Sequence, residues 1–134
     1  MGTVFLVIGT IFVAIASLFH FVIFYFESLA WGKPATWKRF GVANQADADT
    51  VKPMAFNQGY YNAFLGLAGI IGIILIATGN PAIGITLALY ATLSMVLAAT
   101  VLITSNPRLA RAAVTQGGAP LLAVIFLAIA LFVS

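Results

Sequence analysis

Four long apolar segments divide the chain, and they constrain its fold more than any other feature. They cover residues 3–26, 55–78, 80–104 and 117–133. A helix needs about 20 residues to cross a hydrocarbon core of about 30 Å. Backbone groups inside a bilayer must bond within their own segment, and these segments lack the alternating pattern of a transmembrane strand. The sequence therefore predicts an all-α, integral membrane four-helix bundle that forms a single domain over residues 1–134.

The composition excludes a water-soluble domain and several kinds of chemistry. Hydrophobic residues make up 63% of the chain, charged residues 7%, and the mean hydropathy is +1.12. Without cysteine there can be no disulfide and no thiolate metal site. One histidine falls short of a catalytic zinc site, and no nucleotide-binding fingerprint occurs. We expect a lipid bilayer as the main partner, no nucleic acid, no metal and no cofactor.

All basic side chains fall in two of the connections between the apolar segments. These connections cover residues 28–54 and 105–116, and they contain Lys33, Lys38, Arg39, Lys52, Arg108 and Arg111. Short basic loops stay in the cytoplasm during insertion. The sequence therefore predicts that both connections are cytoplasmic and that both termini lie on the non-cytoplasmic side. We expect a multi-pass protein of the cell membrane, which would be a bacterial inner membrane or a plasma membrane.

The first connection also carries aromatic residues. Trp31, Trp37 and Phe40 lie among its lysines and arginines. Tryptophan is enriched where a membrane meets water. We expect these three side chains to be interfacial anchors on an amphipathic segment.

His20 and Glu27 are the ionisable side chains, other than tyrosine, inside or bordering an apolar segment. They are seven residues apart, so they share one face of a helix. An ionisable group at membrane depth is a functional hypothesis by default. The alternative is structural. Glu27 would then pair with Lys33, Lys38 or Arg39, and His20 would bond to a neighbouring helix.

Polar side chains are concentrated where the second and fourth apolar segments begin. We expect them near helix amino termini, where free N–H groups and the helix dipole favour anions. They predict one wall of a pocket for a small polar or anionic ligand, or a lipid head group. Structurally, they would instead cap the helix and satisfy His20 and Glu27. The candidate ligand-binding residues are His20, Glu27, Asn57, Gln58, Tyr61, Asn62 and Gln116.

Small residues recur along the second and third segments. Close helix packing in lipid requires small side chains. We expect these residues to serve contacts within the bundle or between copies in a homo-oligomer. They are Gly59, Ala63, Gly66, Gly69 and Gly72, followed by Gly84 and Ala88.

The same polar positions carry a resemblance that covers nearly the whole chain. Its motifs are His20, Glu27, Trp31 and Phe40, then Asn57-Gln58-Gly59 with Tyr61-Asn62, Phe64 and Leu65, then Gln116-Gly117-Gly118 with Pro120. In these residues the chain resembles the domain-of-unknown-function family 1304. The resemblance implies a small membrane protein with four spans, and it supplies no activity.

Three functions compete at this point. The leading one is binding or transport of a small polar molecule or lipid head group in the cytoplasmic half, with proton exchange at Glu27 or His20 coupled to release. The second is a non-catalytic subunit or assembly partner that packs through its glycine faces. The third, which we rank last, is a membrane enzyme with Glu27 and His20 as acid and base.

Overall fold

The computed structural model describes residues 1–133 and contains four long helices and no strand in that range. All four are long and apolar enough to cross a membrane, so the prediction of an all-α, multi-pass membrane protein is confirmed. The long helices are α1 (Gly2–Phe24), α3 (Gln45–Ala77), α4 (Pro81–Ser105) and α5 (Ala110–Phe132). The short ones are a π-helical turn η1 (Tyr25–Leu29), α2 (Pro34–Trp37), and the 3₁₀ turns η2 (Lys38–Phe40) and η3 (Pro107–Leu109).

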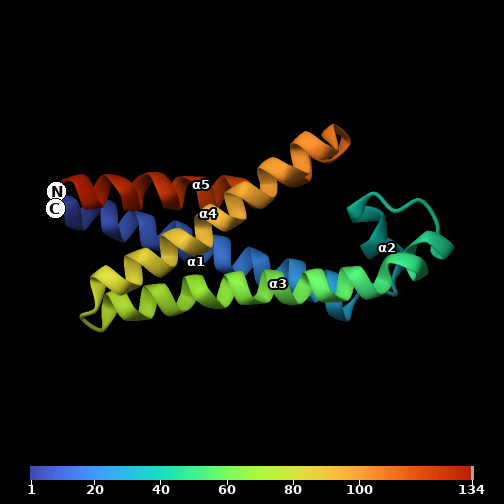
Figure 1. Ribbon diagram of the computed structural model, residues 1–134, viewed down its shortest axis with the longest axis horizontal. Helices are drawn as coiled ribbons and strands as arrows, with labels where there is room; N and C mark the ends of the chain where they lie inside the picture. The colour runs from blue at the N-terminus through green and yellow to red at the C-terminus, as the bar shows by residue number, and fades with distance from the viewer. Residues whose placement is uncertain (134) are drawn as a thin grey trace.

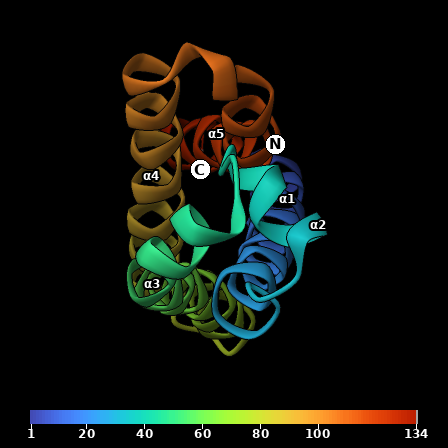
Figure 2. The same cartoon turned by 90° about the vertical axis from the view of Figure 1, so that its right-hand side faces the viewer.

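The long helices form a ring in which each packs against two neighbours. The order around the ring is α1, α3, α4, α5, and Figure 2 shows it end-on. Both termini and the turn between α3 and α4 lie at one end of the bundle in Figure 1, here named the terminal end. The other end holds α2 and the connections from α1 to α3 and from α4 to α5, and is named the loop end.

The turn between α3 and α4 is tight, with three residues between the two helices. Gly79 has a φ of +87°, a left-handed conformation that glycine adopts without steric cost. The amide of Asn80 donates to Leu75 O at 2.8 Å, and the amide of Gly79 donates to Ile76 O at 3.4 Å. These two bonds close the end of α3 in a Schellman motif, and Pro81 then starts α4.

Two long helices begin well before the apolar segments that predicted them. Helix α3 starts at Gln45 because Asn44 caps it: Asn44 Oδ1 accepts from the amide of Asp47 at 2.9 Å. Helix α5 starts at Ala110. Asn57 and Gln116 therefore lie inside helices whose amide groups are already bonded. The expectation that they lie beside free helix amino termini, which supported an anionic ligand, is wrong.

The first connection folds into a small core of its own at the loop end. Trp31 and Trp37 are buried there against Ala48 and Ala55 of α3. Trp31 Nε1 donates to Ala48 O at 3.0 Å. Both tryptophans thus pack within the protein, and their interpretation as interfacial anchors is wrong. They fix the connection to the beginning of α3.

Glycines allow the helices to approach one another closely. A Cβ added at Gly66 would lie 2.9 Å from the Ser17 carbonyl oxygen, and one at Gly72 would lie 2.9 Å from the Gly84 carbonyl oxygen. A Cβ at Gly9 would lie 2.8 Å from the Leu127 side chain. The prediction that small residues serve helix packing is confirmed for Gly66 and Gly72, which pack α3 against α1 and α4.

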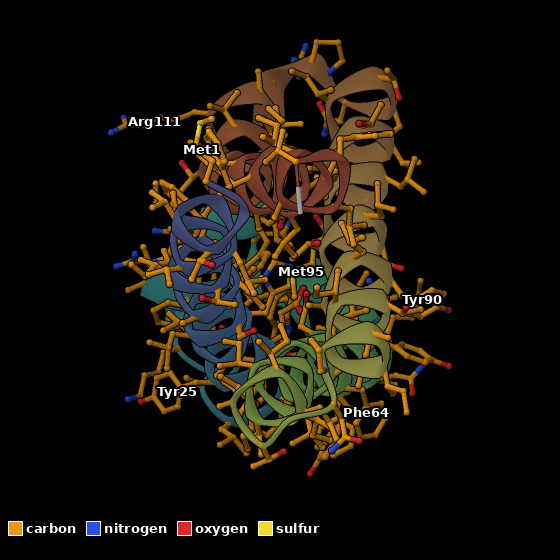
Figure 3. All side chains as sticks on the ribbon, turned by 90° about the vertical axis from the view of Figure 1, so that its left-hand side faces the viewer. Met1, Tyr25, Phe64, Tyr90, Met95 and Arg111 are labelled. Atoms are coloured by element: carbon orange, nitrogen blue, oxygen red, sulfur yellow. The ribbon has the colours of Figure 1, made fainter. Side chains whose placement is uncertain are left out.

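The outer faces of the bundle are apolar, as contact with lipid requires. In Figure 3 Tyr25, Phe64 and Tyr90 point outward, whereas Met95 lies among the four helices. Tyr90 is 68% exposed and Met95 is fully buried. In water this much exposed apolar surface would aggregate. In a bilayer it faces lipid tails.

Gly66→Ala is expected to destabilise the bundle, whereas Gly118→Ala is not. At Gly66 the new methyl group would push the α1 backbone away, and overpacking of this kind typically costs about 1–3 kcal/mol. A Cβ at Gly118 meets nothing within 4 Å, so alanine there is neutral or stabilises the helix by up to about 1 kcal/mol. Unfolding in detergent micelles measures both. Equal stability of the two variants would contradict the close contact between α1 and α3.

Candidate functional site

Glu27 is presented by a π-helical turn that follows α1. In η1 the amide of Ala30 bonds to Tyr25 O, five residues back, at 2.9 Å. A π turn holds one residue more than an α turn, so it changes the direction of the side chains that follow it. Such turns are frequent at functional sites. Here Glu27 and Ser28 both face α3.

Gly59 brings this turn against α3. A Cβ at Gly59 would overlap Ser28 Oγ and lie 3.1 Å from the Ser28 amide nitrogen. Ser28 Oγ donates to Phe56 O at 2.9 Å and fastens the two segments together. The glycine of the Asn57-Gln58-Gly59 motif is therefore required for Glu27 to reach α3.

Asn62 supplies the hydrogen-bond partner of Glu27. Asn62 Nδ2 donates to Glu27 Oε2 at 2.9 Å and lies 3.1 Å from Gln58 O, to which it also donates. Glu27 itself is only 8% exposed. A carboxylate buried beside a neutral amide, without a cation, is unusual because a buried charge is costly unless it is paired.

The basic residues proposed as alternative partners of Glu27 make other contacts. Lys38 Nζ lies 5.6 Å from the centroid of the Trp37 ring, and the Arg39 guanidinium lies 5.1 Å from the centroid of Phe26. Both are cation–π contacts at exposed basic residues. Lys33 is also exposed, and the structure gives it no bond to Glu27. Glu27 is therefore not paired with any of these three cations, and the structural alternative that required such a pair is wrong for Glu27.

His20 lies deeper in the bundle, 2% exposed. Its Nδ1 donates to Ala16 O of its own helix at 2.8 Å, since a carbonyl can only accept. In the neutral ring Nε2 is then an acceptor, and it has no hydrogen-bond partner among residues 1–133. The bond to a neighbouring helix that the structural alternative required is absent from the described residues.

Gln116 lies on the inner face of α5 at the level of His20. It comes three residues after Ala113 and four before Pro120, both buried, so it shares their helix face. Gly9 of α1 packs against Leu127 of the antiparallel α5. His20 is eleven residues after Gly9, and Gln116 is eleven residues before Leu127, which brings both to one level.

The remaining predicted site residues lie on the outer side of α3. Asn57 and Gln58 are exposed, and Tyr61 is 56% exposed. The inner face of α3 carries instead the buried Ala55 and Gly59, with the half-buried Asn62. Of the seven candidates, Glu27 and Asn62 are hydrogen-bonded to each other. His20 of α1 and Gln116 of α5 lie on the inner faces of their own helices.

Two serines matter to this region and were missed in the sequence. Ser28 fastens the Glu27 turn to Phe56 of α3. Ser17 is fully buried one turn before His20, and its hydroxyl has no hydrogen-bond partner in residues 1–133. The spacing of three residues between Ser17 and His20 could have indicated that they share a face.

An apolar cleft lies elsewhere, between α4 and α5. Its volume is about 220 Å³. It contains none of the predicted site residues. Its lining consists of Val96, Ala99, Thr100, Ile103, Ala113, Val114, Gly117, Gly118 and Leu121.

Comparison with known proteins gives a family without an assigned activity. A family model described as a protein of unknown function (DUF1304) matches residues 14–128. No curated protein and no solved structure matches the chain. The matched range includes Glu27, Asn62, His20 and Gln116, and the description of the family assigns no role to any residue.

Asn62→Leu is expected to destabilise the protein more than Asn57→Leu. The first change leaves the buried Glu27 carboxylate without a donor, which typically costs about 1–3 kcal/mol. The second replaces an exposed amide on the same helix and should have little effect.

Unfolding midpoints in detergent, measured for both asparagine variants, for Glu27→Leu and for Asn62→Leu combined with Glu27→Leu, test this coupling. The double variant should lose less stability than the two single changes added together, because it removes both partners. Strict additivity would show that the hydrogen bond does not couple the two residues.

Proposed function

The chain belongs to the DUF1304 family of proteins of unknown function, so its own geometry must indicate its role, and we propose that it binds a small polar molecule inside the loop end of the bundle. The binding residues are Glu27, Asn62, His20 and Gln116. One observation carries the proposal: the Glu27 carboxylate, buried near the end of a helix that is long and apolar enough to cross a membrane, has a neutral amide as its partner.

The unused bonding capacity of these residues supports binding. A carboxylate can accept about four hydrogen bonds, and Glu27 accepts one from a side chain. His20 Nε2 and the Gln116 amide have no partner among residues 1–133. Polar groups at membrane depth are costly unless they face protein partners, water or a ligand. A polar molecule bound beside any of these groups would supply a hydrogen bond that the protein does not.

The two ends of the bundle differ in a way that favours exchange through the loop end. Toward the terminal end the interior is filled by Val13, Ala88, Ala123 and Leu127, all with no exposed surface. Asn62 and Gln116, by contrast, are half-buried. We therefore propose binding and release from the loop end, with no path past the apolar core in this conformation.

The orientation follows from the charges. All six basic residues belong to the connections and the helix ends at the loop end. The positive-inside rule would place this end in the cytoplasm. The ligand would then come from the cytoplasm, and both termini would lie on the opposite side of the cell membrane.

Single cysteines test access to the site, since the natural chain contains none. Gln116→Cys should react with a membrane-impermeant thiol reagent in inverted vesicles, whose cytoplasmic face is outward, and stay protected in intact cells. Ala123→Cys, in the apolar core, should stay unreacted in both.

The two preparations separate the parts of the proposal. Reaction of Gln116→Cys in intact cells alone would reverse the orientation and leave the site standing. No reaction in either preparation, with rapid reaction after unfolding, would show that the site is sealed and would contradict the proposed function.

A further inference from the structure

The atoms that the site offers to a ligand are mainly acceptors. Glu27 has two carboxylate oxygens and receives one side-chain hydrogen bond, from Asn62. His20 uses its N–H on Ala16 O, which leaves the lone pair of Nε2. A ligand that binds either group must therefore donate a hydrogen bond to it.

Within residues 1–133, no basic side chain forms a salt bridge with Glu27. Lys38 lies over the ring of Trp37, and Arg39 lies over the ring of Phe26. Arg111, on the first turn of α5, points away from the bundle in Figure 3. The acceptor oxygens of the buried Glu27 carboxyl group are thus available to a positive ligand.

An anionic ligand finds no matching group. Anions in proteins are held by basic side chains or by helix amino termini. Helix α3 begins at Gln45 and α5 at Ala110, so Asn62 and Gln116 are in helix interiors. An anion placed beside Glu27 would also be repelled by its carboxylate.

We infer that the ligand is a small organic cation, a primary or secondary amine, whose N–H group donates to the Glu27 carboxyl group. This inference rests on the proposed function. The ammonium group would lie at Glu27, where Asn62 Nδ2 fixes the carboxylate by donating to Oε2. The aliphatic part would pack among the apolar side chains of the bundle, as in other ligand sites where a few polar groups fix orientation.

Three probes of matched size test the charge preference: butylamine, butyramide and butyrate. Each is added to the full chain in detergent micelles, and its dissociation constant is measured by NMR saturation transfer and from the shift in unfolding temperature. Butylamine should bind about tenfold to a hundredfold more tightly than butyramide, the ratio that a hydrogen bond to a charged group typically contributes. Butyrate should bind most weakly.

Glu27→Gln should remove the preference for butylamine over butyramide, because glutamine keeps the shape and the acceptor oxygen but not the charge. Asp49→Asn is the matched control. Asp49 is an exposed carboxylate of α3 that accepts from Gln45 Nε2 at 2.8 Å, so its loss should leave the preference unchanged.

The comparison of the three probes on the unmodified protein is decisive even if Glu27→Gln fails to fold. Equal binding of butylamine and butyramide, or tighter binding of butyrate, would overturn the inference. Labelling of Gln116→Cys is independent of these probes. A site that reacts with the thiol reagent but has no preference for butylamine would leave the proposed function standing and remove only its cationic ligand.

Discussion

Glu27 must be held inside a helix bundle that offers its carboxylate no cation, and the surrounding structure is arranged to meet that requirement. The π turn η1 directs Glu27 toward α3, and Gly59 has no side chain to keep the turn away. Asn62, one turn further along α3, then donates to the carboxylate at 2.9 Å. Burial without charge pairing is costly in lipid, so a group kept in this state is a strong candidate for binding.

The bundle is built differently at its two ends. At the terminal end, Gly9 against Leu127 and Gly72 against Gly84 let the helices approach closely, and the interior there is packed with fully buried apolar side chains. At the loop end, the interior faces carry Glu27, His20, Asn62 and Gln116. This asymmetry favours a site that exchanges its ligand on one side. A carrier would have to separate the contacts between α1 and α5 to open the other side.

Much of the fold was predictable from the sequence, because the apolar segments and the Gly79–Pro81 turn are governed by local rules. The early start of α3 was missed because residues 45–54 are polar, although Asn44 followed by Asp47 is a recognisable helix cap. That error also suggested an anionic ligand. Within the candidate site, Glu27 and His20 stood out as ionisable groups in lipid. The outward direction of Asn57 and Tyr61 depends on how α3 packs against α1, which helical spacing alone cannot fix.

The most direct test of the account is an experimental structure of the protein with 4-bromobenzylamine, a stable amine whose bromine can be located by anomalous scattering. The account predicts bromine density inside the bundle, with the amine nitrogen beside Glu27 and Asn62. Bromine density confined to the apolar cleft between α4 and α5, with unchanged packing around Glu27, would contradict it.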